Sequence, residues 1–327
     1  MEKYSLIVDI AGITTTIASN PFSYSSLLCK VKFIMKIRSI IQNLIILCVF
    51  PMNSVQAFEQ IINCSHIELC KLAKLIILEN ELQGLKTNSL VNITGDPHEY
   101  EPSTLEIKSL ISSKYLLNGP NELNPWIKKI NFQRSKNSEL STLTVIFDKN
   151  DLNFYPRAST EELSHFWLYP KIYCSFKIKI ENEFKKLGYN IIAKNNCATQ
   201  AITLEANLTK VLSELDLPII LTHNALLPLL ISLDPKKNIR SIIAIKGSGH
   251  HEEASTLAIK KMYDALKSKQ VIWIEETGIH VPSNILNKIR STDIKIRIDT
   301  ATSSEQIAFS TLQNLADQLS LIAGKKQ

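Results

Sequence analysis

Short apolar runs alternate with segments of helical periodicity along the second half of the chain. Each run is followed by residues in which apolar positions recur every three or four places, the spacing of one helix face. The runs that read as strands are residues 218–222, 241–245, 271–274 and 294–298. Strands alternating with helices predict a parallel sheet that is covered by helices on both sides.

The first half repeats this rhythm less regularly. Ser103 and Glu106 have the spacing of a capping box, so a helix is expected to begin there. A helical stripe over residues 172–187 ends at Gly188. Residues 133–164 are polar, with few regular patterns, and are predicted to be loop over much of their length. The predicted strands of this half are residues 60–64, 89–93, 115–117 and 143–147.

A chain of 327 residues suits two domains, each with its own core. Between the two halves, one helix face runs from Ala201 to Leu215 and is ended by Pro218. We therefore expect an α/β protein of two lobes, each with a mainly parallel sheet flanked by helices, joined by a long linking helix. The expected division is residues 58–195 for the first lobe, 196–217 for the linking helix and 218–327 for the second lobe.

The N-terminal region carries the pattern of an export signal. Positive residues follow Met35, residues 40–50 are apolar, and Val55 and Ala57 stand at the key positions of a small-residue cleavage site. We interpret residues 35–57 as a signal peptide that ends near Ala57, which predicts a periplasmic protein, and residues 1–34 as an upstream extension. An ordinary buried helix is the alternative for the apolar stretch, which is too short for a comfortable membrane span.

Composition narrows the class of protein. A hydrophobic share of 45% and a charged share of 21% are typical of a globular chain. No glycine-rich phosphate-binding motif is present, which argues against nucleotide chemistry. The net charge of +6 is spread along the chain without a basic stripe, which argues against nucleic-acid binding. Cys64, Cys70, Cys174 and Cys197 would follow the cleavage site, and both disulfides and free thiols remain open for them.

Three histidines and one aspartate lie where α/β folds place ligand-binding groups. His98 lies in a loop between a predicted strand and the capped helix, and His165 lies just before a helix. His223 and Asp299 each follow directly on a predicted strand. Three imidazoles and one carboxylate form a set that zinc accepts in tetrahedral geometry. Satisfied structural histidines are the alternative for each position taken alone.

Two further groups could bind or orient a metal. Residues 249–253 read G-H-H-E-E and could form a second metal site, although acidic residues also favour a helix start. Glu275 and Glu276 follow a predicted strand close to the expected site. One of them could orient a ligand, and solvated acids at the start of a helix explain them equally well.

The short sequence motifs around the histidines resemble those of a known family. Residues 96–103 read D-P-H-E-Y-E-P-S, which resembles the D-P-H-x-Y-E-P-[ST] motif of the periplasmic metal-binding proteins of zinc and manganese ABC importers (cluster A-I). Residues 165–170, H-F-W-L-Y-P, resemble that family's H-x-W-L-D-P. Residues 222–225, T-H-N-A, resemble the motif that carries the family's third metal ligand. Asp299 falls where the family's last carboxylate ligand follows the final strand.

The resemblance, which is to the zinc-uptake type, implies two lobes joined by a rigid helix, with a metal in the cleft. The first lobe would supply His98 and His165, and the second His223 and Asp299. The implied function is high-affinity capture of a divalent metal by a monomer, and delivery to the membrane permease of an ABC importer without covalent chemistry. Because nitrogen at the third ligand position favours zinc, Zn²⁺ is expected, with Mn²⁺ or iron as the alternative.

The sequence also departs from the family pattern. Tyr169 stands where the motif has aspartate, and residues 131–164 contain no histidine, so the metal-collecting loop of many zinc receptors is absent. A changed partner of a metal ligand can weaken binding, so a degenerate receptor is one alternative. A zinc hydrolase is another, although no H-E-x-x-H or G-x-S-x-G motif is present. An adhesin that keeps the receptor fold is the third.

Overall fold

The computed structural model describes residues 6–10, 13–17, 59–89, 100–192, 196–236, 241–246, 255–299 and 309–324. The chain divides into two compact units, residues 1–58 and residues 59–327. In the first unit, β1 (Leu6–Ile10) and β2 (Ile13–Ile17) form an antiparallel pair. The predicted signal peptide lies outside the described residues. Across the described part of the chain, no helix has the length and apolar character needed to cross a membrane.

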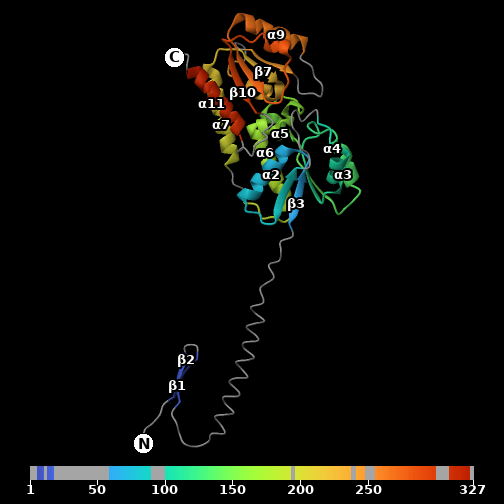
Figure 1. Cartoon of the computed structure of the whole chain (residues 1–327), viewed down its shortest axis with the longest axis vertical. Helices are drawn as coiled ribbons and strands as arrows, with labels where there is room; N and C mark the ends of the chain where they lie inside the picture. Colours follow the sequence, from blue (N-terminus) through green and yellow to red (C-terminus); the bar gives the residue numbers. More distant parts are fainter. Residues whose placement is uncertain are drawn as a thin grey trace, which may run out of the picture. The chain divides into compact units, whose positions relative to one another are not determined.

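The second unit begins with a four-stranded parallel sheet in the order β4-β3-β5-β6. Its strands are β3 (Gln60–Cys64), β4 (Leu85–Ser89), β5 (Tyr115–Asn118) and β6 (Ser141–Thr144). The helices of this half are α2 (Ile67–Glu79), α3 (Thr104–Ser112), α4 (Ile127–Arg134), α5 (Lys149–Phe154) and α6 (Pro170–Lys186). Figure 1 shows α2 and α6 beside one another, and these two helices are in contact.

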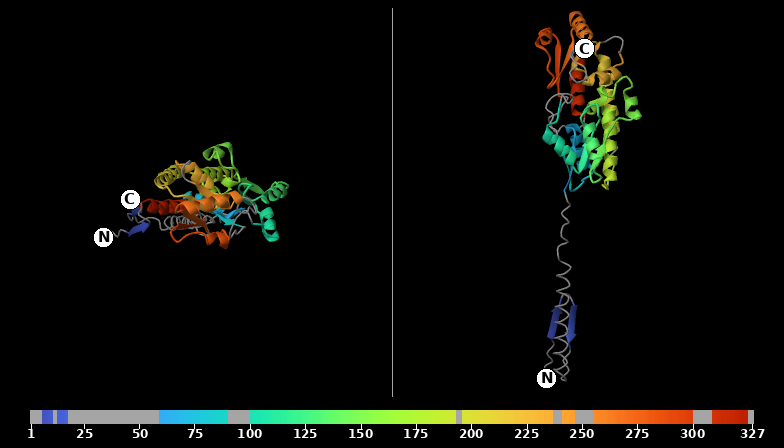
Figure 2. Two further views of the ribbon diagram at one scale, coloured as in Figure 1. Left: turned by 90° about the horizontal axis from the view of Figure 1, so that it is seen from above. Right: turned by 90° about the vertical axis from the view of Figure 1, so that its right-hand side faces the viewer.

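A second four-stranded parallel sheet follows, in the order β10-β9-β7-β8. Its strands are β7 (Ile219–His223), β8 (Ile242–Lys246), β9 (Ile272–Glu276) and β10 (Ile294–Ile298). The helices are α8 (Leu227–Leu233), α9 (Thr256–Ser268), α10 (Ser283–Leu286) and α11 (Ser310–Gly324). The two sheets with their helices confirm the predicted α/β class, and Figure 2 shows the two halves from two further sides.

Helix α7 (Cys197–Glu214) lies between the two sheets in sequence. It packs against α6 from the first half and against α11 from the second, as Figure 1 shows for α11. Its buried residues include Ala201, Leu204, Leu208 and Val211, which are positions of the predicted apolar face. The role of this helix as a rigid link, and the boundaries at residues 195 and 217, stay predictions.

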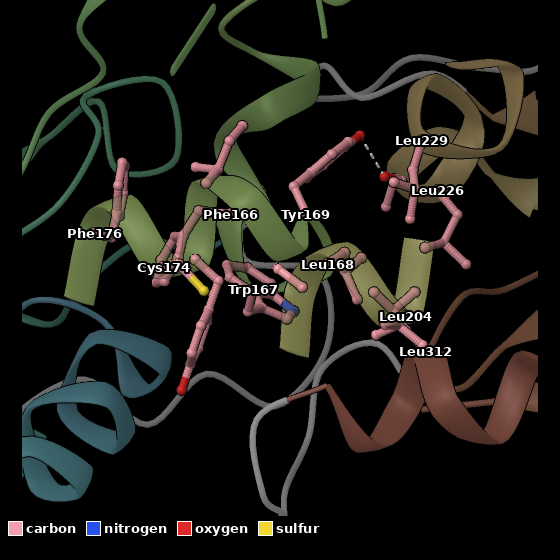
Figure 3. Packing of buried hydrophobic residues seen from close by; sticks show 14 of the residues in the cluster. Phe166, Trp167, Leu168, Tyr169, Cys174, Phe176, Leu204, Leu226, Leu229 and Leu312 are labelled. Atoms are coloured by element: carbon pink, nitrogen blue, oxygen red, sulfur yellow. Dashed lines mark hydrogen bonds between the residues drawn. The ribbon is translucent and has the colours of Figure 1, made fainter. Parts of the chain in front are cut away.

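One of the hydrophobic clusters of the described residues contains side chains from both halves, and Figure 3 shows part of it. Phe166 comes from the first half, Leu204 from α7 and Leu312 from α11, and all three belong to this cluster. Because burial of apolar area stabilises a fold roughly in proportion to the area, the two halves are stabilised by one shared core.

All four cysteines beyond Ala57 form disulfides. Cys64 at the end of β3 pairs with Cys70 in α2, and Cys174 in α6 pairs with Cys197, the first residue of α7. The Cα–Cα distances are 5.5 Å and 5.7 Å, within the usual range for a disulfide. The pairing resolves the alternative that the sequence left open.

The structure of the first half differs in detail from what the sequence predicts for two strands and one polar segment. β4 covers residues 85–89 and so includes only Ser89 of the predicted strand, whose residues 90–93 lie outside the described residues. β6 covers residues 141–144, whereas the prediction was 143–147. The segment predicted to be mainly loop contains β6, α5 and the 3₁₀ turn η2 (Glu162–Ser164). The capping box at Ser103 and Glu106 was confirmed, with both of its hydrogen bonds present.

Candidate metal centre

His165 lies between two short turns, η2 and η3 (Phe166–Leu168), and α6 begins five residues later at Pro170. On either side of it, Leu163 and Phe166 are completely buried, and Leu168 is 1% exposed. These apolar neighbours anchor the segment in the core and fix where the imidazole lies. Pro170 in the first turn of α6 suits a helix start, because proline lacks the N–H that such a position leaves unpaired.

His223 is the last residue of β7, a strand in which every residue is buried. The neighbouring strand β9 is held in register by the backbone N–H of Glu276, which donates to the Thr222 hydroxyl at 3.0 Å. This register places Glu276, the last residue of β9, beside His223. Carboxyl ends of parallel strands are where α/β sheets bind ligands.

The structure brings His165 and His223 together from the two halves of the chain. Their ring centroids are 5.4 Å apart, with an angle of 73° between the ring planes. Each residue is only 3% exposed. Two imidazoles from different lobes therefore converge on one buried place.

Glu276 is the carboxylate nearest to this pair among the contacts described. Its Oε2 lies 3.4 Å from His223 Nδ1, and the residue is 1% exposed. This distance is longer than a normal N–H···O hydrogen bond, so the contact is mainly electrostatic. A carboxylate at Nδ1 favours the tautomer protonated there, which leaves Nε2 for a metal.

Of the other two predicted ligands, His98 and Asp299, the structure describes only Asp299. His98 lies outside the described residues, as does the G-H-H-E-E segment at residues 249–253. Asp299 is half-buried and follows Ile298, which pairs with Glu276, so it belongs to the same sheet edge as His223. Its backbone carbonyl accepts a hydrogen bond from the Thr311 hydroxyl at 2.9 Å. Within the described ranges, no three His, Cys, Asp or Glu side chains are grouped closely enough to hold a metal.

An aromatic row continues from His165 into the first half. The Trp167 ring lies edge-on to His165 at 5.3 Å and stacks on His66 at 5.1 Å. His66 is buried, and its Nδ1 accepts from the backbone N–H of Glu68 as the N-cap of α2. Sequence reasoning gave His66 no part near the site, and the stacking partner that links it to His165 comes from a distant segment.

Tyr169 joins the two histidine segments. Its hydroxyl donates to the backbone carbonyl of Ala225 at 2.7 Å, the dashed line in Figure 3. Burial raises the pKa of the Tyr169 phenol well above its ordinary value, and the nearby carboxylates of Glu162 and Glu276 raise it further. The hydroxyl therefore stays protonated and remains a donor.

Comparison with solved structures gives the fold a precedent. The laminin-binding protein Lmb of Streptococcus agalactiae, described as a bifunctional protein with adhesin and metal transporting activity, matches at a TM-score of 0.60 and 15% identity, over 82% of this chain and 100% of Lmb. TroA, the periplasmic zinc-binding protein of Treponema pallidum, matches at 0.56 and 13%, over 81% and 99% of the two chains. The chain has the fold of these metal-binding proteins.

A third match has manganese bound. The solute-binding protein FpvC of Pseudomonas aeruginosa, in complex with Mn²⁺, matches at a TM-score of 0.51 and 17% identity, over 81% of this chain and 97% of FpvC. No family model and no curated protein sequence matches the chain. The fold expected from the motif resemblance is confirmed, and identities this low concern the fold alone.

Proposed function

We propose that this protein is the metal-binding receptor of an ABC importer, which captures a divalent transition metal and delivers it to a membrane permease. The observation that carries the proposal is the meeting of His165 and His223, one from each half, with ring centroids 5.4 Å apart and each residue 3% exposed. The two-lobed fold supports it, because Lmb, TroA and FpvC are all described as binding or transporting metals.

We propose zinc as the cargo, held by His98, His165, His223 and Asp299. Imidazole nitrogens favour zinc over manganese, and two of them already converge here. Zinc is named for TroA and manganese for FpvC, so the fold serves both metals and the ligand set must discriminate. In this proposal Glu276 orients the His223 ring, as a carboxylate partner commonly does for a metal-binding histidine.

The proposed work is binding and release. Four protein ligands would fill the tetrahedral shell of zinc, whereas a hydrolase keeps one position open for water. A signal peptide ending near Ala57 would deliver the chain to the periplasm, where such a receptor meets its permease. The adhesin activity named for Lmb is a property of that protein, and no feature of the described residues favours it here.

Removal of either converging histidine tests the proposal. We expect the wild type to bind one zinc ion per chain, and His165→Ala or His223→Ala to lose affinity by about 100-fold or more, because each removes a direct ligand. Competition against a chelator of known affinity measures the effect.

The matched control is His280→Ala, which removes an exposed imidazole from the segment after β9. It should leave zinc affinity unchanged. Equal zinc affinity in the wild type and both site variants would reject the proposed site. Absence of zinc and manganese binding by the wild type would reject the function.

A further inference from the structure

One buried hydrogen bond connects the segment that carries His165 to the segment that carries His223. Tyr169 stands four residues after His165, and its hydroxyl donates to the Ala225 carbonyl at 2.7 Å. Ala225 stands two residues after His223, in the turn η4 (Asn224–Leu226). The bond therefore lies within four residues of both histidines and crosses between the two halves of the chain.

Both ends of this bond are held firmly. Tyr169 and Ala225 are each 0% exposed. The Tyr169 ring lies edge-on to the Tyr155 ring, with centroids 5.1 Å apart. Figure 3 shows Tyr169 reaching from the start of α6 toward the turn beside Leu226 and Leu229, which belong to the shared core. A side chain enclosed in this way has little freedom to move, so the bond fixes the separation of the two segments.

We infer that Tyr169 is a positioning residue: its hydroxyl holds the His223 segment against the His165 segment, so that the two imidazoles are at metal-binding separation before the metal arrives. The inference rests on the proposed function. It attributes part of the protein's affinity for the metal to Tyr169, a residue that does not itself bind the metal. A preformed site binds its metal more tightly, because the ligands are already ordered and binding loses less conformational entropy.

The sequence places this tyrosine where the resembling family motif has aspartate. From the sequence, tyrosine in place of aspartate indicates a weakened site, because a change in a residue that supports a metal ligand commonly lowers the affinity for the metal. The structure gives the departure another meaning: the longer phenol spans the two halves and makes a hydrogen bond at Ala225. We therefore expect Tyr169 to support metal binding in this chain.

Tyr169→Phe tests the inference, because it removes only the hydroxyl. The matched control is Tyr155→Phe. Tyr155 is 1% exposed, and its hydroxyl donates to Glu205 of α7 at 2.5 Å, a bond that involves neither histidine segment. The Tyr155 ring, which packs against Tyr169, is kept in this variant. Both variants lose one buried hydrogen bond, so a general loss of stability would appear in both.

Two measurements on the full chain separate the outcomes. By chelator competition, Tyr169→Phe should bind zinc about tenfold more weakly than the wild type, and Tyr155→Phe should bind it normally. By hydrogen exchange on metal-free protein, amides of residues 224–233 should exchange faster in Tyr169→Phe only.

Normal zinc affinity in Tyr169→Phe, or an equal loss in Tyr155→Phe, would overturn the inference. Unchanged exchange at residues 224–233 would overturn it as well, since the hydroxyl would then not hold that segment. A wild type that binds no zinc would instead reject the proposed function. That result is distinct from a wild type that binds zinc with the same affinity as Tyr169→Phe, which would reject only the role of Tyr169.

Discussion

At the scale of single residues, the site depends on which of two adjacent glutamates faces His223. Successive side chains of a strand point to opposite faces of the sheet, and the pairing of β9 with β7 puts Glu276 beside the imidazole. Glu275 is half-buried, while Glu276 is 1% exposed. The sequence singled out both residues and left the choice open, because register is fixed only when the strands pair.

This difference gives a paired prediction. Glu276→Gln keeps the shape of the side chain and removes its charge, so the His223 ring loses the carboxylate that favours a proton on Nδ1. Zinc affinity should fall about tenfold. Glu275→Gln, the neighbouring control, should bind zinc normally in the same chelator competition. Equal affinities for the two variants would show that Glu276 does not orient His223.

The histidines themselves were accessible from the sequence, for two separate reasons. His223 ends an apolar run, and the structure puts it at the end of β7. His165 was singled out by its place before a predicted helix and by its motif, and the structure puts it before α6, with the turn η3 between them. Their proximity was not accessible, since 58 positions separate residues 165 and 223 in the printed sequence and only the fold brings them together.

At the scale of elements, local hydrogen-bonding signals were read more reliably than strand positions. The capping box of α3 was recognised from Ser103 and Glu106 alone. Residues 85–88 of β4 were not predicted to be strand because the sequence of β4, L-K-T-N-S, is mostly polar. It lies at the edge of its sheet, where a strand needs less apolar surface, so the hydrophobic pattern gave little guidance.

Helix α5 shows a second limit of sequence reading. Its capping box joins Asp148 and Asp151, with aspartate in the third position instead of the usual glutamate or glutamine. The helix has six residues and lies in a polar stretch, so neither periodicity nor the standard motif indicated it. Lys179 of α6 pairs with Asp151, a contact between segments far apart in sequence.

The capping box of α3 also predicts a pH effect on stability. Hydrogen bonds from the Tyr100 hydroxyl and from Ser103 lower the pKa of Glu106, against a smaller opposing effect of burial. A lowered folded-state pKa stabilises the fold above the unfolded pKa of about 4.3, and this stability is lost as the pH falls through the folded pKa.

Glu106→Gln should therefore be less stable than the wild type at neutral pH, and the gap should narrow as the pH falls below about 4. Urea unfolding at pH 7 and at pH 3 measures the difference in the free energy of unfolding. A gap that is constant or wider at low pH would contradict the assignment of this carboxylate as a stabilising acceptor.

At the scale of the whole molecule, the alternation of strands and helices was sufficient to predict the α/β class and the two parallel sheets. This alternation does not predict which contacts join the two halves. The shared core, the contacts of α7 with α6 and α11, and the bond from Tyr169 to Ala225 all join segments distant in sequence. Such contacts depend on the folded arrangement and leave no periodic signal.

Buried charge adds to this connection. Glu205 of α7 is 5% exposed and accepts from the Tyr155 hydroxyl, while Lys171 of α6 pairs with its other oxygen at 2.6 Å. A buried carboxylate is tolerated when its oxygens are matched in this way. The Cys174–Cys197 disulfide joins the same two helices. Helix α7 is thus attached to the first half by covalent, ionic and apolar contacts together.

We propose that one divalent metal is held where the two halves meet, with His165 and His223 among its ligands. Anomalous diffraction at the zinc edge, on crystals of the protein grown with zinc, tests it most directly. We expect one dominant anomalous peak about 2.0–2.1 Å from a ring nitrogen of each histidine. A dominant peak elsewhere, with both of these imidazoles free of metal, would contradict it.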